Sequence, residues 1–183
     1  MTLACRRAAA SDTAAILEVH RAAFSSHLES DLVAALLTHR SAHPAESWVA
    51  QVDGVVVGHV LLTPGRVKAD PALTVMLLCP LAVLPSHQHT RVGTALTRAA
   101  IDAARDAGVR AITVFGDPEY YSRFGFESLL PGGPLPAFDV AEGQRDAWQT
   151  LLLGDGADLT RASLDGKRIV WADPLMTPSL WEG

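Results

Sequence analysis

The sequence has little of several features that mark particular classes of protein. Its two cysteines, Cys5 and Cys79, are too few for a disulfide framework, so we expect reduced thiols and a small, buried Cys79. Lysine occurs only at Lys68 and Lys167, and 20 acidic residues outnumber 15 basic ones, which gives a net charge of −5. Because no basic stripe is available for a phosphate backbone, we expect no nucleic-acid binding.

Long hydrophobic runs and targeting segments are also missing. The longest apolar run, 73–84, is too short to cross a bilayer and contains Pro80, so no membrane span is predicted. Near the N-terminus, Cys5 and the Arg6-Arg7 pair lack the apolar stretch that a lipoprotein box or a twin-arginine signal requires. We therefore expect a cytoplasmic protein.

The length and the apolar content indicate one globular domain. A chain of 183 residues that is 49% apolar can bury a single core. We expect one domain over 1–183, with its core elements in 1–126 and late strands and a tail in 127–183. No internal repeat is visible, and the Pro/Gly-rich loop at 131–136 is too short to separate two domains.

The first half of the chain predicts a strand, two helices and a hairpin. Apolar residues recur every three or four positions in both predicted helices, and Ser11 or Asp12 can cap the first. Asp53-Gly54 suits the positive φ angles of a tight hairpin turn. The predicted elements are a strand over 2–7, helices over 16–23 and 28–36, and hairpin strands over 48–52 and 55–62.

The middle of the chain predicts a parallel crossover. An apolar strand over 73–83 contains Pro80, which removes a donor from the ladder and predicts a bulge or splay. A helix over 92–107 stops at Gly108, and a buried strand over 109–115 follows. Strand, helix and strand in this order form a right-handed parallel unit. Later strands are predicted over 148–153 and 168–171, around a turn region over 154–166.

Two segments carry chemistry. PLAVLPSHQHTRVGTAL, over 80–96, places a strand, a polar loop and a helix N-terminus in succession, where free backbone N–H groups and the helix dipole favour a phosphate or pyrophosphate. GDPEYYSRFGF, over 116–126, places two tyrosines in a short helical turn that ends at Gly125, directly after a buried strand.

Together these segments resemble the GNAT superfamily of acyl-CoA-dependent N-acyltransferases. The family pattern, Gln or Arg, two residues, Gly, one residue, Gly or Ala, is matched at Gln88 and Gly93, while Arg91 replaces the first Gly. YYSRFGF is similar to the family's Tyr-x-x-hydrophobic-Gly-Phe ending. The helix around Glu29 and the Gly58-His59 strand also resemble a bacterial subgroup that carries a GDPxYYxRFGF-type segment.

The resemblance implies a fold and a reaction. We expect a single α/β (α+β) domain on a twisted, mixed and mostly antiparallel sheet flanked by helices, with acetyl-CoA as co-substrate in the splay between the central strands. The expected reaction is direct transfer of an acetyl group to a primary amine in a ternary complex. The resemblance assigns cofactor binding to Leu81, Ala82, Val83, Gln88, His89, Thr90, Arg91, Val92, Gly93, Thr94 and Tyr121.

The resemblance also implies catalytic roles. Tyr121 falls at the position of the general acid, and a backbone N–H near 81–83 can stabilise the oxyanion. Tyr120 is expected in the core or the cleft wall. The general base stays open between Glu29, His59 and a water chain, and each has a structural alternative: Glu29 as a first-turn acid, His59 as a half-buried histidine.

The backbone conformation of Arg91 decides between two interpretations of the loop, an intact phosphate site and a broken one. If it lies in the first helical turn at negative φ, which we expect, its side chain fits and adds a phosphate contact; if its backbone needs a glycine conformation, the phosphate site is broken. The second reading predicts a non-catalytic acyl-CoA-binding or regulatory module.

The partners are less well defined. His87 and His89 lack a third ligand, so no metal site is predicted. The acceptor is a small-molecule or peptide amine, 127–183 is expected on the acceptor side, and the protein is expected to be a monomer or a homodimer.

Overall fold

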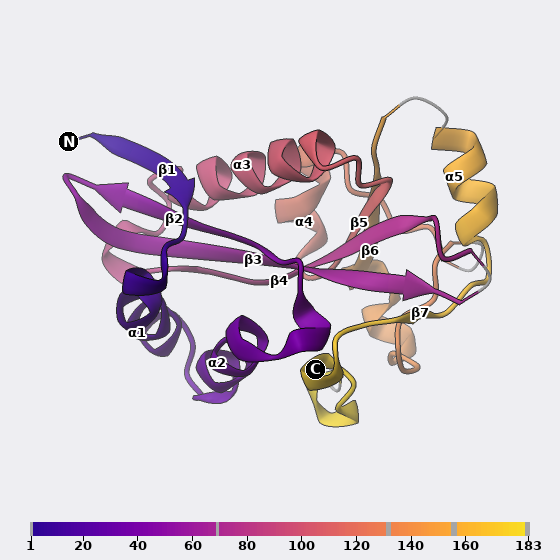
Figure 1. The fold of residues 1–183 in the computed structure, drawn as a ribbon, viewed down its shortest axis with the longest axis horizontal. Helices are drawn as coiled ribbons and strands as arrows, with labels where there is room; N and C mark the ends of the chain where they lie inside the picture. Colours follow the sequence, from indigo (N-terminus) through magenta and orange to yellow (C-terminus); the bar gives the residue numbers. More distant parts are fainter. Residues whose placement is uncertain (1, 69, 131–132, 155–156, 182–183) are drawn as a thin grey trace.

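A seven-stranded sheet organises the protein, as a computed structural model of residues 2–68, 70–130, 133–154 and 157–181 shows (Figure 1). The first six strands lie side by side in chain order, and the seventh pairs with the third. Among the named strands of the described residues, the fourth and fifth pair in parallel and the other pairings are antiparallel. The strands are β1 Leu3–Arg7, β2 Glu46–Val52, β3 Val55–Val67, β4 Thr74–Val83, β5 Ala111–Phe115, β6 Trp148–Leu152 and β7 Ile169–Val170.

Helices cover both faces of the sheet. In Figure 1 the first two helices lie on one side of it and the long third helix on the other. None of the described helices is long and apolar enough to cross a membrane. The helices are α1 Thr13–Ala23, α2 Leu28–Thr38, α3 Val92–Asp106, α4 Pro118–Tyr121 and α5 Ala157–Leu164.

Alternating side chains along the strands form the core. Val60 and Leu62 of β3 belong to the cluster under α3, whereas Leu61 between them belongs to the cluster on the opposite face, together with Leu36 of α2. Successive side chains of a strand point to opposite faces, so one strand supplies both layers. The mixed α/β fold predicted from the sequence is confirmed.

The predicted hairpin and crossover are confirmed. Asp53 and Gly54 have φ angles of 49° and 85° and join β2 to β3, which runs farther than predicted, to Val67. α3 ends just before Gly108, whose φ is 73°, and leads into β5. Positive φ is the backbone conformation that glycine adopts at low cost.

The sheet is interrupted at Pro80, as the sequence predicts. Leu62 of β3 pairs with Leu78, but Val60 pairs with Leu81, so two residues of β4 lie opposite Leu61. This is a β-bulge. Beyond it β4 continues to Val83, whereas its parallel pairing with β5 has already ended at Leu77 and Thr113. The two central strands therefore diverge, and the predicted splay is confirmed.

The C-terminal third contains one element that the sequence analysis missed. The late strands are present as β6 and β7, but the predicted turn region 154–166 includes α5. The loop predicted over 131–136 lies partly outside the described residues, at 131–132. After β7 the chain packs Trp171 and Trp181 against Trp148 of β6.

Gly65 of β3 provides a test of this packing. A Cβ atom built at Gly65 would lie 2.3 Å from the ring of Trp171 and 2.7 Å from Ile169. We expect Gly65→Ala to lower the free energy of unfolding by about 1–3 kcal/mol, because a buried ring must move. Urea denaturation measures this change.

Gly143→Ala is the matched control. Nothing lies within 4 Å of a Cβ built at Gly143. We expect this variant to stay within about 0.5 kcal/mol of the parent. Equal stabilities of the two variants would contradict the tight contact between β3 and Trp171.

Candidate active site

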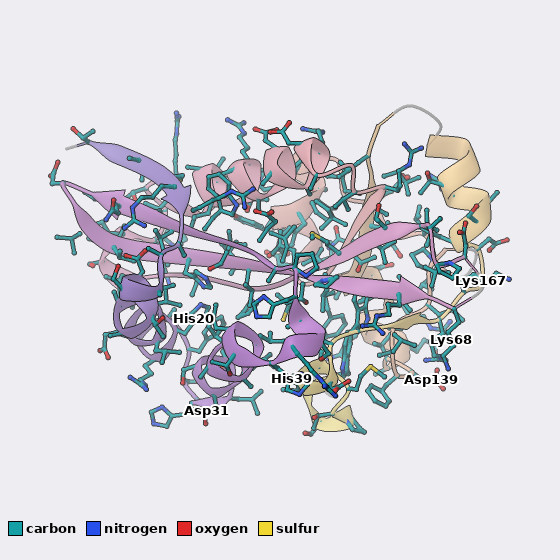
Figure 2. All side chains as sticks on the ribbon, in the orientation of Figure 1. His20, Asp31, His39, Lys68, Asp139 and Lys167 are labelled. Carbon is teal, nitrogen blue, oxygen red and sulfur yellow. The ribbon has the colours of Figure 1, made fainter. Side chains whose placement is uncertain are left out.

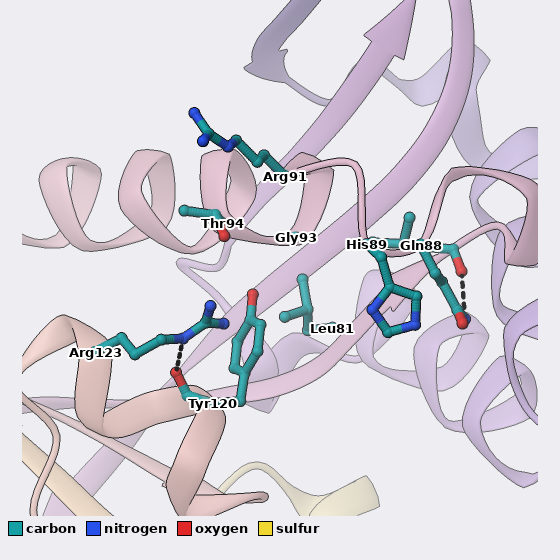
Figure 3. A pocket seen from close by; sticks show the side chains of 9 residues that line it. Leu81, Gln88, His89, Arg91, Gly93, Thr94, Tyr120 and Arg123 are labelled. Atoms are coloured by element: carbon teal, nitrogen blue, oxygen red, sulfur yellow. Dashed lines mark hydrogen bonds between the residues drawn. The ribbon is translucent and has the colours of Figure 1, made fainter.

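A cleft of about 470 Å³ lies beside the N-terminus of α3. We call it the loop cleft; Figure 3 shows it from close by. Its walls come from the end of β4, the loop before α3, the first turn of α3 and the segment around α4. The lining residues are Leu81, Val83, Gln88, His89, Arg91, Gly93, Thr94, Tyr120 and Arg123.

Backbone N–H groups without a backbone acceptor lie beside this cleft, at the start of α3. His87 and Gln88 donate to the carbonyls of Leu84 and Pro85, and the next backbone hydrogen bond along the chain is donated by Ala95 to Arg91. Between them lies the N-terminus of α3, where N–H groups have no intrahelical acceptor and the helix dipole is positive. The Gln88 side chain ties the loop to β4 by donating to the Val83 carbonyl at 3.2 Å. Such a geometry binds anions without a charged side chain.

Arg91 does not have the backbone conformation that the sequence analysis expected. It is the N-cap of α3 at φ 69°, in the left-handed region, and His89 has φ 61°. The expectation of negative φ is therefore wrong, because the loop must reverse sharply to enter α3. In Figure 3 the Arg91 side chain runs back along α3, on the other side of the helix from Tyr120. The loop still connects β4 to α3, but the backbone of Arg91 is strained.

The backbone of β4 also faces the cleft. The N–H of Leu84 donates to Val57 of β3, so this residue points toward β3. Because backbone groups alternate along an antiparallel strand, those of Ala82 also point toward β3, and those of Leu81 and Val83 point to the open side. The bond from Gln88 to the Val83 carbonyl agrees with this orientation.

A second cavity, of about 490 Å³, lies where β4 and β5 diverge. We call it the splay pocket. Leu81 and Tyr120 line both this pocket and the loop cleft, so the two cavities meet at these side chains. The splay pocket is lined by Phe24, Glu29, Leu78, Cys79, Pro80, Leu81, Phe115, Gly116, Asp117, Tyr120 and Tyr121.

The two tyrosines of α4 have different surroundings. The hydroxyl of Tyr120 lies 3.1 Å from Thr97 Oγ1 on α3, and the Arg123 guanidinium stacks 4.6 Å from the centre of its ring. The hydroxyl of Tyr121 has no hydrogen-bond partner among the described residues, and its side chain is buried against the splay pocket. Burial raises the pKa of both phenols, and the neighbouring Tyr120, Cys79 and Asp117 raise the pKa of Tyr121 further.

The structure brings most of the predicted cofactor residues together. All but four line the loop cleft: Ala82 points its backbone to β3, Val92 is in the core, Thr90 is exposed on the loop, and Tyr121 lines the splay pocket instead. The sequence analysis missed Arg123, and it placed Tyr120 correctly in the cleft wall. Arg123 follows Tyr120 by three residues in a helical turn, a spacing that puts both on one face.

His59 lies on β3, under α1. Its side chain is fully buried, with Nδ1 2.9 Å from His20 Nε2 of α1 and Nε2 3.0 Å from Ser47 Oγ. Figure 2 shows His20 between α1 and the sheet. Burial lowers the pKa of His20 to about 4, and burial together with the charge of His20 lowers the pKa of His59 to about 3. His59 is more deeply buried than the half-buried histidine expected, and it lines neither cavity.

Glu29 and Cys79 both line the splay pocket. Ser26 Oγ donates to Glu29 Oε2 at 3.0 Å, which orients this carboxylate in the first turn of α2. Burial raises the pKa of the Cys79 thiol to about 12, and the charge of Glu29 adds to this shift. The thiol is therefore protonated at neutral pH and is a poor nucleophile.

A comparison with known families agrees with this arrangement. The model of the acetyltransferase (GNAT) family matches residues 13–126, from α1 to the end of the YYSRFGF segment. The chain belongs to the GNAT acetyltransferase family. The resemblance drawn from the two motifs is confirmed, and with it the expectation of a GNAT-type N-acetyltransferase.

Three individual proteins are similar to this GNAT acetyltransferase in sequence or in structure. An uncharacterized N-acetyltransferase of Escherichia coli K12, YjhQ, is 39% identical over 140 residues, covering 75% of this chain and 77% of YjhQ. The crystal structure of E. coli YhbS in complex with CoA has a TM-score of 0.77 at 26% identity and covers 94% of this chain and 91% of that chain. A GNAT acetyltransferase from Brucella melitensis in complex with acetyl-CoA has a TM-score of 0.71 at 26% identity, covering 94% and 97%.

The strain at Arg91 of this GNAT acetyltransferase can be measured. Arg91→Gly and Arg91→Ala both remove the guanidinium, but only glycine relieves the left-handed backbone. We expect the glycine variant to be about 0.5–1 kcal/mol more stable than the alanine variant, after its greater unfolded-state entropy is taken into account. Chemical denaturation of both variants measures the difference, and a more stable alanine variant would contradict the positive φ.

The buried histidines make the stability depend on pH. Their native pKa values, about 4 for His20 and about 3 for His59, lie below the ordinary value of 6.5. The unfolded chain therefore binds more protons as the pH falls below 6.5, and the native state loses stability until the native pKa values are reached. We expect a loss on the order of 2 kcal/mol per histidine between about pH 7 and about pH 5.

The double variant His20→Gln, His59→Gln serves as the reference for this measurement. Its free energy of unfolding should change less over the same pH interval, because the two titrating groups are gone. Urea denaturation at both pH values gives the two slopes. Parallel slopes for parent and variant would show that the histidines are not held neutral in the native state.

Proposed function

We propose that this protein transfers the acetyl group of acetyl-CoA directly to a primary amine in a ternary complex. The observation that carries the proposal is the meeting of two cavities at Leu81 and Tyr120, where β4 and β5 diverge. One cavity has the N–H groups that suit a pyrophosphate, and the other has acidic and phenolic groups that suit an amine. The CoA in the YhbS structure and the acetyl-CoA in the Brucella structure support this assignment.

The loop cleft fits coenzyme A in two respects. The N–H groups at the start of α3 provide hydrogen bonds for the pyrophosphate, and the Arg123 guanidinium supplies a cation in the same cleft. The outward backbone groups of Leu81 and Val83 provide a strand edge with which the amide-bearing pantetheine arm can pair. Arg91 is not assigned a phosphate contact, because its side chain turns back along α3 (Figure 3).

Leu81 and Tyr121 are assigned to the reacting atoms. The amine lone pair forms a C–N bond to the acetyl carbon while the C–S bond breaks, and the outward N–H of Leu81 stabilises the carbonyl oxygen. Tyr121 gives its proton to the departing thiolate and regains one from solvent. Its raised pKa keeps the phenol protonated before this step. The products are the N-acetyl amine and the CoA thiol.

Glu29 is the proposed acceptor for the proton that the amine loses. It lines the splay pocket together with Tyr121, and Ser26 holds its carboxylate in place. Proton transfer to Glu29, directly or through a water molecule, completes the balance of the reaction. His59 is not proposed for this role, because it lines neither cavity and both its ring nitrogens are held by His20 and Ser47.

Calorimetric titration tests the proposed cofactor site. The variant Tyr121→Phe tests the proposed general acid. We expect the protein to bind acetyl-CoA and desulfo-CoA with micromolar affinity. Tyr121→Phe should bind acetyl-CoA as the parent does, since Tyr121 lines the splay pocket and not the loop cleft, but turnover should fall by about 10²–10⁴-fold. Turnover is followed as release of the CoA thiol.

Tyr120→Phe is the control for loss of a hydroxyl in α4. The Tyr120 hydroxyl is already held by Thr97, so this variant should lose far less turnover than Tyr121→Phe. A larger loss at Tyr120 would reverse the assignment of the acid. Absence of acetyl-CoA binding by the native chain would overturn the proposed function, and its appearance in Arg91→Gly would favour the non-catalytic module.

A further inference from the structure

The splay pocket continues toward the C-terminal segment. A hollow of about 140 Å³, which we call the tail pocket, shares Glu29, Cys79, Pro80 and Phe115 with it. The remaining lining of the tail pocket is apolar and comes from α2, β4 and the segment after β7. These residues are Leu28, Leu32, Leu77, Leu175, Leu180 and Trp181.

The charges around these two pockets have one sign. Glu29 lines both pockets, and Asp117 lies at the exposed edge of the splay pocket. No lysine, arginine or histidine is among the described residues that line either pocket. Asp117 Oδ1 accepts the N–H of Glu119 at 2.9 Å, and the Asp117 side chain is exposed. An ammonium group is therefore favoured where the two pockets meet.

The polarity changes from one pocket to the other. The splay pocket holds both tyrosines, whereas the described residues that line the tail pocket alone have apolar side chains, Trp181 among them. The Trp181 indole N–H is already used, since it donates to the Leu175 carbonyl at 2.8 Å. Among the residues that the structure describes, no polar side chain is thus available at the far end for a charged group of the acceptor.

We propose that the acceptor is a small primary amine with an apolar chain or ring and without a carboxylate. This inference rests on the proposed function and defines its substrate class. The amine lies near Glu29 and Tyr121, and the apolar part occupies the tail pocket against Leu180 and Trp181. Burial of that apolar surface contributes to binding in proportion to its area.

A carboxylate on the acceptor is disfavoured for a physical reason. In the tail pocket it would lose its hydration and meet Glu29 with no cation to pair with. Burial of an unpaired charge is costly, so amino acids should be much poorer acceptors than amines of the same length.

Three acceptors of equal chain length test this class: hexylamine, aminocaproate, and the neutral amide of aminocaproate. We expect kcat/KM for hexylamine to exceed that for aminocaproate by on the order of 10²-fold, with the amide between them. The readout is acetyl-dependent release of CoA thiol. Equal or better use of aminocaproate would overturn the proposed acceptor class.

A charge introduced at Leu180 tests the location. Leu180 is partly exposed on the wall of the tail pocket, and Leu180→Lys would supply the missing cation. We expect this variant to use aminocaproate about tenfold better than the parent and hexylamine less well. Leu3→Lys, at an exposed position on β1, is the matched control and should keep the parent's preference. An unchanged preference in Leu180→Lys would overturn the placement of the apolar part.

Titration with acetyl-CoA distinguishes a wrong acceptor class from a missing cofactor site. If acetyl-CoA binds but aminocaproate is used at least as well as hexylamine, or no tested amine is acetylated, the acceptor class is wrong while the cofactor site stands. If acetyl-CoA does not bind, the proposed function fails. Preferred acetylation of a peptide N-terminus over hexylamine would likewise overturn a small apolar amine as the acceptor.

Discussion

The divergence of β4 and β5 is the constraint on which the site depends. Parallel pairing stops at Leu77 and Thr113, and the bulge around Pro80 turns the rest of β4 away. The backbone of Leu81 consequently has no partner strand on its outer side. Both cavities open at this break, so the same interruption of the sheet leaves a free strand edge in one cavity and forms a wall of the other.

The chemistry of the site relies on backbone dipoles and on burial more than on charged side chains. Both lysines lie at the end of the molecule near α5 (Figure 2), away from the loop that starts α3. An N-terminus of a helix can attract an anion in a protein of net charge −5, because its field is local. Around the splay pocket, burial keeps Tyr121 and Cys79 in their neutral forms. A low-dielectric site of this kind strengthens the hydrogen bonds made in it.

Local patterns predicted the elements, and long-range contacts decided the details. The Asp53-Gly54 turn, the stop at Gly108 and the bulge at Pro80 each follow from the conformational limits of one or two residues. The φ angle of Arg91 was mispredicted because it depends on how the loop must turn between β4 and α3. The burial of His59 is set by His20, which lies 39 residues earlier on α1. α5 was missed in a region whose flanking glycines, Gly154 and Gly166, indicated a turn.

The sequence by itself determined the order of the elements as far as β5, the polar loop before α3 and the pair of tyrosines, because hydrophobic periodicity and turn residues act within a few positions. Only the tertiary structure decided which side chains share a cavity. It placed Tyr121 and Glu29 in one pocket, enclosed His59 between His20 and Ser47 away from both cavities, and brought Leu180 and Trp181 into a hollow with Glu29. These contacts join segments that are far apart in the chain. They form because the diverging strands and the packed helices fix where each side chain lies.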